Sequence, residues 1–249
     1  MMPSPDLIVF SALVFVLAGL VKGVLGFGLP TVVVALLALA LPPTQALALL
    51  VVPSFATNLA QGAVGGHFVA LCRRLWPMGL GIVLGTLVGG RLTAALFGPE
   101  AATATRTGLG IALVVYGMSG LLGRPPTLPG RLERLLAGPA GLVSGVMTAA
   151  CGVFVFPLAP FLQSLGLSRA ALSQALGIAF TLATVALAGN LLDGDRLSGR
   201  DLLWSVAGLV PALAGMALGM RLRDRMQPAI FSAVFLLGLA GLGLHLALA

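Results

Sequence analysis

The only lysine of the sequence lies inside an apolar stretch that glycines interrupt. The segment AGLVKGVLGFGLPT, residues 18–31, contains Lys22 and, directly after it, the glycine-rich run 23–28. Glycine lets the backbone approach a ligand closely, and the unpaired N–H groups of a broken helix carry partial positive charge. Beside a lysine ammonium, such groups suit an anion. The predicted substrate-binding residues of this segment are Lys22, Gly23, Gly26, Phe27 and Gly28.

A later segment repeats this one. The sequence AGLVKGV around Lys22 recurs as AGLVSGV at residues 140–146, with Ser144 at the position of the lysine. In the same order, GTLVGGRL at residues 85–92 recurs as GMALGMRL at residues 215–222. Two echoes at nearly the same separation indicate an internal repeat. The second break adds Ser144, Gly145, Thr148, Cys151 and Gly152 to the predicted site.

Two amides complete the predicted site. Asn58 and Gln61 lie about one helical turn apart on the long apolar segment 44–66, which follows the first break. Each of these features also has a plainer interpretation. In that interpretation the amides form hydrogen bonds between helices, and the glycines allow helices to pack closely. Lys22 extends its apolar stem toward the membrane interface.

Composition decides which solvent surrounds these residues. Of the 249 residues, 59% are hydrophobic and 8% charged, and the mean hydropathy is +1.10. Soluble domains carry about 25% charged residues, so this composition predicts an all-α polytopic membrane protein. The apolar segments are 7–21, 29–41, 44–66, 75–90, 107–122, 136–149, 153–165, 170–192, 202–220 and 229–249.

The segment lengths predict two broken hairpins. The pairs 7–21 with 29–41 and 136–149 with 153–165 are short, so each pair either spans the membrane or re-enters it. The chain therefore has 8 to 10 membrane segments. Each half has five apolar segments, one broken hairpin plus three longer spans, and an odd number makes the second half inverted. The predicted organisation is a first repeat 1–122, a cytoplasmic linker 123–135 and a second repeat 136–249.

Inverted repeats with broken helices are typical of secondary transporters, whose substrate site lies near the membrane centre where the repeats meet. The two breaks are expected to approach each other there. The sequence thus predicts a small anionic substrate and a lipid bilayer as partners, with alternating access as the mechanism; it leaves the oligomeric state open.

Several other functions are disfavoured by the distribution of charge. The net charge is +7, but the basic residues stand singly or in short clusters between apolar segments, so no nucleic acid is expected. All seven carboxylates lie in loops or at segment ends, which leaves no intramembrane proton relay and no catalytic acid. Cys72 and Cys151 have no metal-type spacing. We expect no enzyme, no cofactor, no metal site and no removable signal peptide.

Basic residues predict the orientation. Cytoplasmic loops of membrane proteins carry the excess of lysine and arginine, and this rule favours both termini in the periplasm of a bacterial inner membrane. The residues predicted on the cytoplasmic side are Lys22, Arg73, Arg74, Arg124, Arg131, Arg134, Arg169, Arg221, Arg223 and Arg225. Those predicted outside are Arg91, Arg106, Arg196 and Arg200.

Four motifs resemble the TauE/SafE family of bacterial membrane proteins, the sulfite exporter group. They are GLVKGVLGFGLP at residues 19–30, LPPTQA at 41–46, GLVSGVMTAACG at 141–152 and LGLSRAALSQALGIAF at 165–180. The chain departs from the family pattern at Leu29 and Pro30, where further glycines are common. It also departs in the second motif, which is reduced to Ala-Ala-Cys-Gly at residues 149–152.

The resemblance implies transport of sulfite, sulfonates or related organosulfur anions across the inner membrane. Export of sulfite or an organosulfonate is the main prediction. The alternatives are uptake of a related sulfur-containing or carboxylate anion, and a non-transporting membrane scaffold.

Reporter fusions test the predicted orientation. Alkaline phosphatase attached after Ala249 should be active and a fluorescent protein attached there should be dark, because both termini are predicted in the periplasm. The same reporters inserted within the linker 123–135 should give the opposite pattern and serve as the control. A fluorescent C-terminal fusion contradicts the orientation.

Overall fold

The protein is described by a computed structural model of residues 4–123, 125–223, 225 and 227–248, and this part of the chain is helical without any strand. The predicted all-α class is confirmed. The helices are α1 (Pro5–Leu25), α2 (Leu29–Leu37), α3 (Pro43–Ala63), α4 (Phe68–Phe97), the 3₁₀ turn η1 (Gly98–Glu100), α5 (Ala101–Leu121), α6 (Gly130–Cys151), α7 (Leu158–Gln163), α8 (Arg169–Asp193), α9 (Gly199–Arg223) and α10 (Pro228–Leu248).

Seven helices in the described residues are long and apolar enough to cross a membrane: α1, α3, α4, α6, α8, α9 and residues 229–248 of α10. A crossing takes about 20 helical residues. Many leucine, valine and phenylalanine side chains on the outer faces of these helices are exposed, as expected where lipid is the solvent. The chain is therefore a multi-pass membrane protein.

The first helix of each predicted hairpin is longer than its apolar segment. α1 has 21 residues and α6 has 22, so the predicted bounds 7–21 and 136–149 are too short. Each helix continues until a glycine adopts a left-handed conformation, Gly26 at φ +84° and Gly152 at φ +72°. Only the second members are short, with nine residues in α2 and six in α7. α7 starts later than its segment 153–165 because residues 152–157 are not helical.

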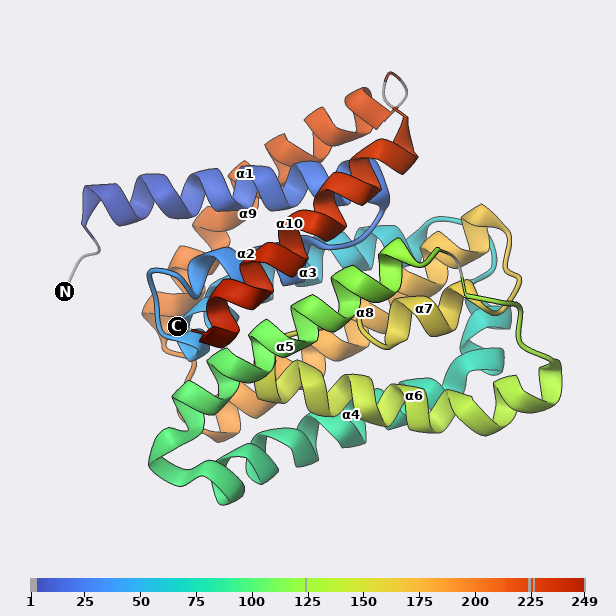
Figure 1. Ribbon diagram of the computed structural model, residues 1–249, viewed down its shortest axis with the longest axis horizontal. Coiled ribbons are helices and arrows are strands. Elements are labelled where there is room, and N and C mark those ends of the chain that lie inside the picture. The colour runs from blue at the N-terminus through green and yellow to red at the C-terminus, as the bar shows by residue number, and fades with distance from the viewer. Residues whose placement is uncertain (1–3, 124, 224, 226, 249) are drawn as a thin grey trace.

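The long helices pack in pairs, as Figure 1 shows. α1 lies along α9, α4 along α6, α5 along α10 and α3 along α8. Apart from Thr31, the short α2 is apolar, and it is almost entirely buried, which is the pattern of a helix surrounded by other helices. The start of α1 and the end of α10 lie at one end of the bundle, together with the α4–α5 connection (Figure 1).

The opposite end of the bundle carries most of the basic residues, and we call it the arginine-rich end. The α3–α4, α5–α6, α7–α8 and α9–α10 connections lie there (Figure 1). Its described arginines are Arg73, Arg74, Arg131, Arg134, Arg169, Arg221, Arg223 and Arg225. Arg124, predicted on the same side, lies outside the described residues. Arg74 forms an ion pair with Glu133 there, at 2.6 Å.

Glycines bring the paired helices into direct backbone contact. A Cβ added to Gly19 of α1 would lie 2.0 Å from the carbonyl oxygen of Ala212 on α9. In the other pair, a Cβ on Gly85 of α4 would lie 2.1 Å from the carbonyl oxygen of Leu142 on α6. The repeated motifs of the sequence are thus the contact faces of these pairs, as small residues at regular spacing allow.

This packing predicts a strong asymmetry between two glycine-to-alanine substitutions. Gly85→Ala should destabilise the protein by about 1–3 kcal/mol, because the methyl group overpacks a backbone contact. Gly238→Ala on α10 is the matched control, since no atom lies within 4 Å of its added Cβ. It should be neutral or slightly stabilising, because alanine favours a helix by about 1 kcal/mol over glycine. Thermal unfolding in detergent measures both, and equal shifts contradict the close contact.

Candidate functional site

Lys22 is a buried lysine whose amine is held by an amide. Its side chain is only 4% exposed, and its ammonium donates a hydrogen bond to Oδ1 of Asn58 on α3. Among the described residues, no carboxylate forms an ion pair with it. The side chain thus turns into the bundle, toward α3. A buried ammonium is costly unless it is paired, so this position favours an anion as its partner.

A line of polar groups extends from Lys22 toward the middle of α3. Asn58 donates from Nδ2 to Oγ of Ser54 at 3.0 Å, and Ser54 shares a hydrogen bond of 3.0 Å with Oγ1 of Thr184 on α8. All three side chains are fully buried. Because each group holds the next, Asn58 is fixed with its oxygen toward the ammonium. The line connects α1, α3 and α8 through side chains alone.

Gln61 lies one turn further along α3 and ties the first break to α8. Its Nε2 donates to the carbonyl oxygens of Gly26 and Ser173, both at 2.9 Å. Two carbonyl acceptors require an amide nitrogen at this position, which fixes the orientation of the side chain. Its Oε1 is buried and has no partner among the described residues. Gln61 therefore closes the polar line on the side of the arginine-rich end.

The start of α2 adds an unpartnered hydroxyl. Thr31 lies in the first turn of α2, its side chain is fully buried, and its Oγ1 has no hydrogen-bond partner in the described part of the chain. The helix begins after Gly28, which is left-handed at φ +102° and supplies no side-chain cap. The N-terminus of a helix attracts anions through its free N–H groups and its dipole. A buried hydroxyl without a partner at this end adds one more donor.

The second break uses its polar groups locally. Ser144 donates to the carbonyl oxygen of Phe154 at 3.4 Å, Thr148 donates to that of Ser144 at 2.8 Å, and the Cys151 thiol contacts that of Met147 at 3.1 Å. In the described residues no hydrogen bond joins this group to Lys22. The break itself packs against the first hairpin.

The glycines of the predicted site differ in how much space surrounds them. A Cβ on Gly152 would lie 2.5 Å from Leu47 of α3, while one on Gly26 would meet nothing within 4 Å. Gly23 and Gly145 lie in the α1–α9 and α4–α6 contacts, so the structure gives them the packing role named above. Phe27 and Gly28 lie between Gly26 and α2.

The structure thus brings together Lys22, Gly26, Asn58 and Gln61 from the predicted set. It adds Ser54, Ser173 and Thr184, which the sequence analysis did not name, and it leaves the hydroxyl of Thr31 without a described partner at the start of α2. Ser54 could have been found, since it lies four residues before Asn58 and so on the same helix face. The threonines stand in apolar runs and give no such signal.

The site is closed in this conformation. Lys22, Asn58 and Thr184 are buried, whereas Gly26, Phe27, Gln61 and Ser173 are partly exposed. The partly exposed members thus lie at Gln61, at the first break and at the start of α8. One amine with neutral hydrogen-bonding groups in a buried setting is chemically suited to a small anion.

Comparison with known proteins agrees with the motifs. A family model described as Sulfite exporter TauE/SafE matches residues 11–246. The match runs from α1 into α10 and includes both breaks and the α3–α8 contact. No curated protein and no solved structure matches the chain.

A double-mutant cycle tests the pairing of Lys22 with Asn58. Asn58→Leu should destabilise the protein by about 2–4 kcal/mol, because it leaves a buried ammonium without an acceptor. In a Lys22→Met background the same substitution should cost at least about 1 kcal/mol less, since the charge is gone. Chemical unfolding of the four proteins measures the coupling. Additive effects mean that the two side chains do not interact.

Proposed function

The chain belongs to the TauE/SafE sulfite exporter family, and from this premise we propose that it exports sulfite or an organosulfonate across the bacterial inner membrane by alternating access. The observation that carries the proposal is the ammonium of Lys22. It is buried, it is hydrogen-bonded to an amide, and no carboxylate among the described residues forms an ion pair with it. An anion bound beside it supplies the missing negative charge. The same property makes the site selective for anions over cations.

The neutral donors around Lys22 suit an oxyanion. Sulfite and sulfonates present three oxygens on one sulfur, and each oxygen accepts hydrogen bonds. Lys22 supplies the charge, while Thr31 and the N–H groups at the start of α2 supply neutral donors. Asn58 holds the ammonium in place while the site is empty. Because Lys22 is the single cation in this line, we propose that one substrate anion binds at a time.

Pairwise packing supports two inverted repeats. α1 packs along α9 while its repeat counterpart α6 packs along α4, so each half lends its first long helix to the other half. α1 and α6 run in opposite directions along the bundle (Figure 1). We include α5 among the crossing helices because it packs along α10, and α2 and α7 bring the number of membrane segments to between eight and ten. The two repeats would exchange roles as access alternates.

The orientation follows from the same arrangement. We place the arginine-rich end in the cytoplasm and both termini in the periplasm. Gln61 and the first break then lie on the cytoplasmic side of Lys22, where an exported anion enters. Uptake uses the same site in the reverse direction. A non-transporting scaffold is the alternative from another class, and it requires no saturable flux.

Proteoliposomes containing the purified chain test the proposal. Lys22→Met keeps the length and apolar bulk of the side chain but removes its charge. Sulfite affinity should fall 10- to 100-fold, equivalent to about 1.4–3 kcal/mol, through loss of a charge-assisted hydrogen bond. Stopped-flow measurement of sulfite flux against concentration gives the affinity.

Arg91→Met is the matched control for this experiment. It also removes one positive charge, but from a side chain that is 79% exposed and paired with Asp193 at the other end of the bundle. Its flux and affinity should equal those of the wild type. Unchanged affinity in Lys22→Met overturns the role of Lys22, and absence of saturable anion flux in the wild type favours the scaffold.

A further inference from the structure

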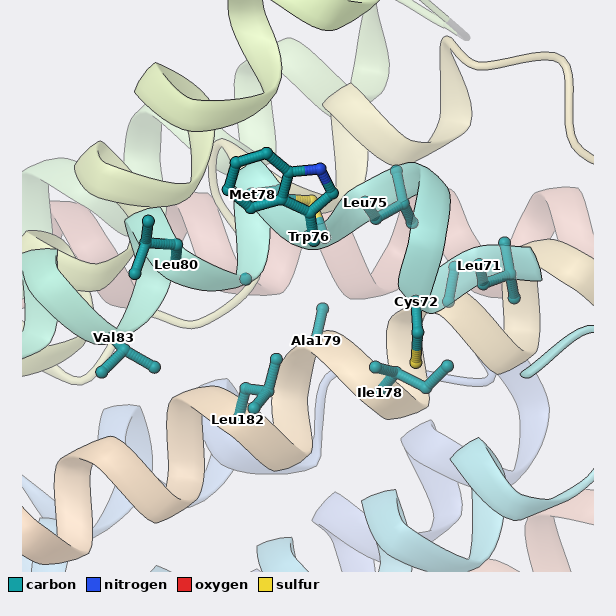
Figure 2. Close-up of a pocket in the computed structure, with 12 residues that line it drawn as sticks. Leu71, Cys72, Leu75, Trp76, Met78, Leu80, Val83, Ile178, Ala179 and Leu182 are labelled. Atoms are coloured by element: carbon teal, nitrogen blue, oxygen red, sulfur yellow. The ribbon is translucent and has the colours of Figure 1, made fainter. Parts of the chain in front are cut away.

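An apolar groove lies between α4 and α8, away from Lys22. Its volume is about 370 Å³. The lining residues are Leu71, Cys72, Leu75, Trp76, Met78, Gly79, Leu80, Val83, Ala175, Ile178, Ala179 and Leu182. Figure 2 shows the α4 side chains along one wall and those of α8 along the other, with open space between them. The labelled side chains of both walls are apolar except for two groups, the thiol of Cys72 and the indole nitrogen of Trp76.

Between the lining residues Cys72 and Trp76, α4 carries an arginine that has no partner within the described chain. Arg73 precedes Trp76 by three residues and Leu80 by seven, so the three share one face of α4. Arg73 is exposed and forms no ion pair or hydrogen bond with the described residues. The adjacent Arg74 differs, because Glu133 holds it through two hydrogen bonds of 2.6 and 2.7 Å.

Trp76 occupies the level between this charge and the apolar part of the groove. Its side chain is 64% exposed. Tryptophan is enriched where lipid headgroups meet acyl chains, and arginine is enriched just outside that level. Leu71 and Cys72 line the groove beside Arg73, and the apolar lining continues inward past Trp76 to Gly79, Leu80 and Val83. A phosphate at Arg73 would therefore leave an acyl chain free to extend past Trp76 along the inner part of the groove.

We propose that the groove binds one acyl chain of an anionic phospholipid whose headgroup contacts Arg73. The size favours a chain over a helix. A helix with its side chains is about 10–12 Å wide, and 370 Å³ would hold only about one turn of it. Charge complementarity favours an anionic headgroup, since an arginine near the surface attracts it electrostatically. The inference depends on membrane insertion and not on which substrate is transported.

Quenching of Trp76 by brominated lipid tests the proposal. The chain has two tryptophans, so Trp204→Phe leaves Trp76 as the only reporter. The full-length protein is placed in phosphatidylcholine bilayers that contain a small fraction of brominated phosphatidylglycerol or, separately, brominated phosphatidylcholine. Bromine quenches only at contact. At equal mole fraction, we expect at least threefold greater quenching by the anionic lipid, and saturation at a low fraction.

Two substitutions separate the headgroup contact from the groove. Arg73→Gln should make the two brominated lipids equally effective, because it removes the charge and changes only an exposed side chain. Gly79→Leu should also abolish the excess quenching by filling the groove, since a Cβ there already approaches Leu182 to 3.2 Å. Gly238→Leu adds the same side chain in open space on α10 and should preserve the excess. The Arg73→Gln result stands alone if Gly79→Leu does not fold.

Two results overturn the proposal. Equal quenching by both lipids at every mole fraction, unchanged by Arg73→Gln, means that only ordinary surrounding lipid touches Trp76. Protection of Trp76 from both lipids, together with disulfide cross-linking of Cys72 between two copies, means that a second copy of the chain covers the groove.

Discussion

The buried ammonium of Lys22 constrains the rest of the structure. A charge in this position needs polar partners. Asn58 accepts a hydrogen bond from it, Ser54 holds Asn58, and Thr184 holds Ser54. None of these groups is an anion, so the arrangement holds the lysine without neutralising it. This explains why the middle of α3 and α8, in an otherwise apolar core, contains a connected polar line.

The polar line forms only if α1, α3 and α9 keep fixed positions relative to one another. α1 reaches α9 through direct glycine contacts, and α9 is tied to α3 by Ser205. Pro53 has no N–H, so the carbonyl of Leu49 loses its helical partner, and Ser205 donates to it at 2.7 Å. The same hydroxyl accepts from the backbone N–H of Val52 at 3.0 Å. A proline that weakens α3 thus creates the contact that fixes α3 against the helix pair containing Lys22.

Sequence reasoning recovered the order of the helices because apolar length and glycine breaks are local signals. It underestimated α1 and α6, since Lys22 and the polar start of α6 interrupt hydropathy without interrupting the helix. Lys22, Asn58 and Gln61 were identified because lysine and amides are rare in apolar segments. Thr184 was missed because threonine packs readily among apolar residues, and its contact with Ser54 depends on which helices meet.

The second break shows that a sequence match does not establish a shared role. Ser144 matches Lys22 in the repeat, yet its hydroxyl bonds to a nearby carbonyl, and nothing local in the sequence distinguishes that use from ligand binding. The two echoed segments therefore share a sequence pattern but not a chemistry. Only the first half carries the charge, while Gly152 of the second lies against Leu47.

Because Lys22 is the only lysine, its charge can be observed directly. Protein labelled with ¹⁵N at the lysine side chain gives a single ammonium resonance in nuclear magnetic resonance spectra of the chain in lipid. Titration with sulfite should shift this resonance saturably, at concentrations that match half-maximal flux, because the anion binds the ammonium. Saturable sulfite transport without any change in the Lys22 resonance would contradict the account.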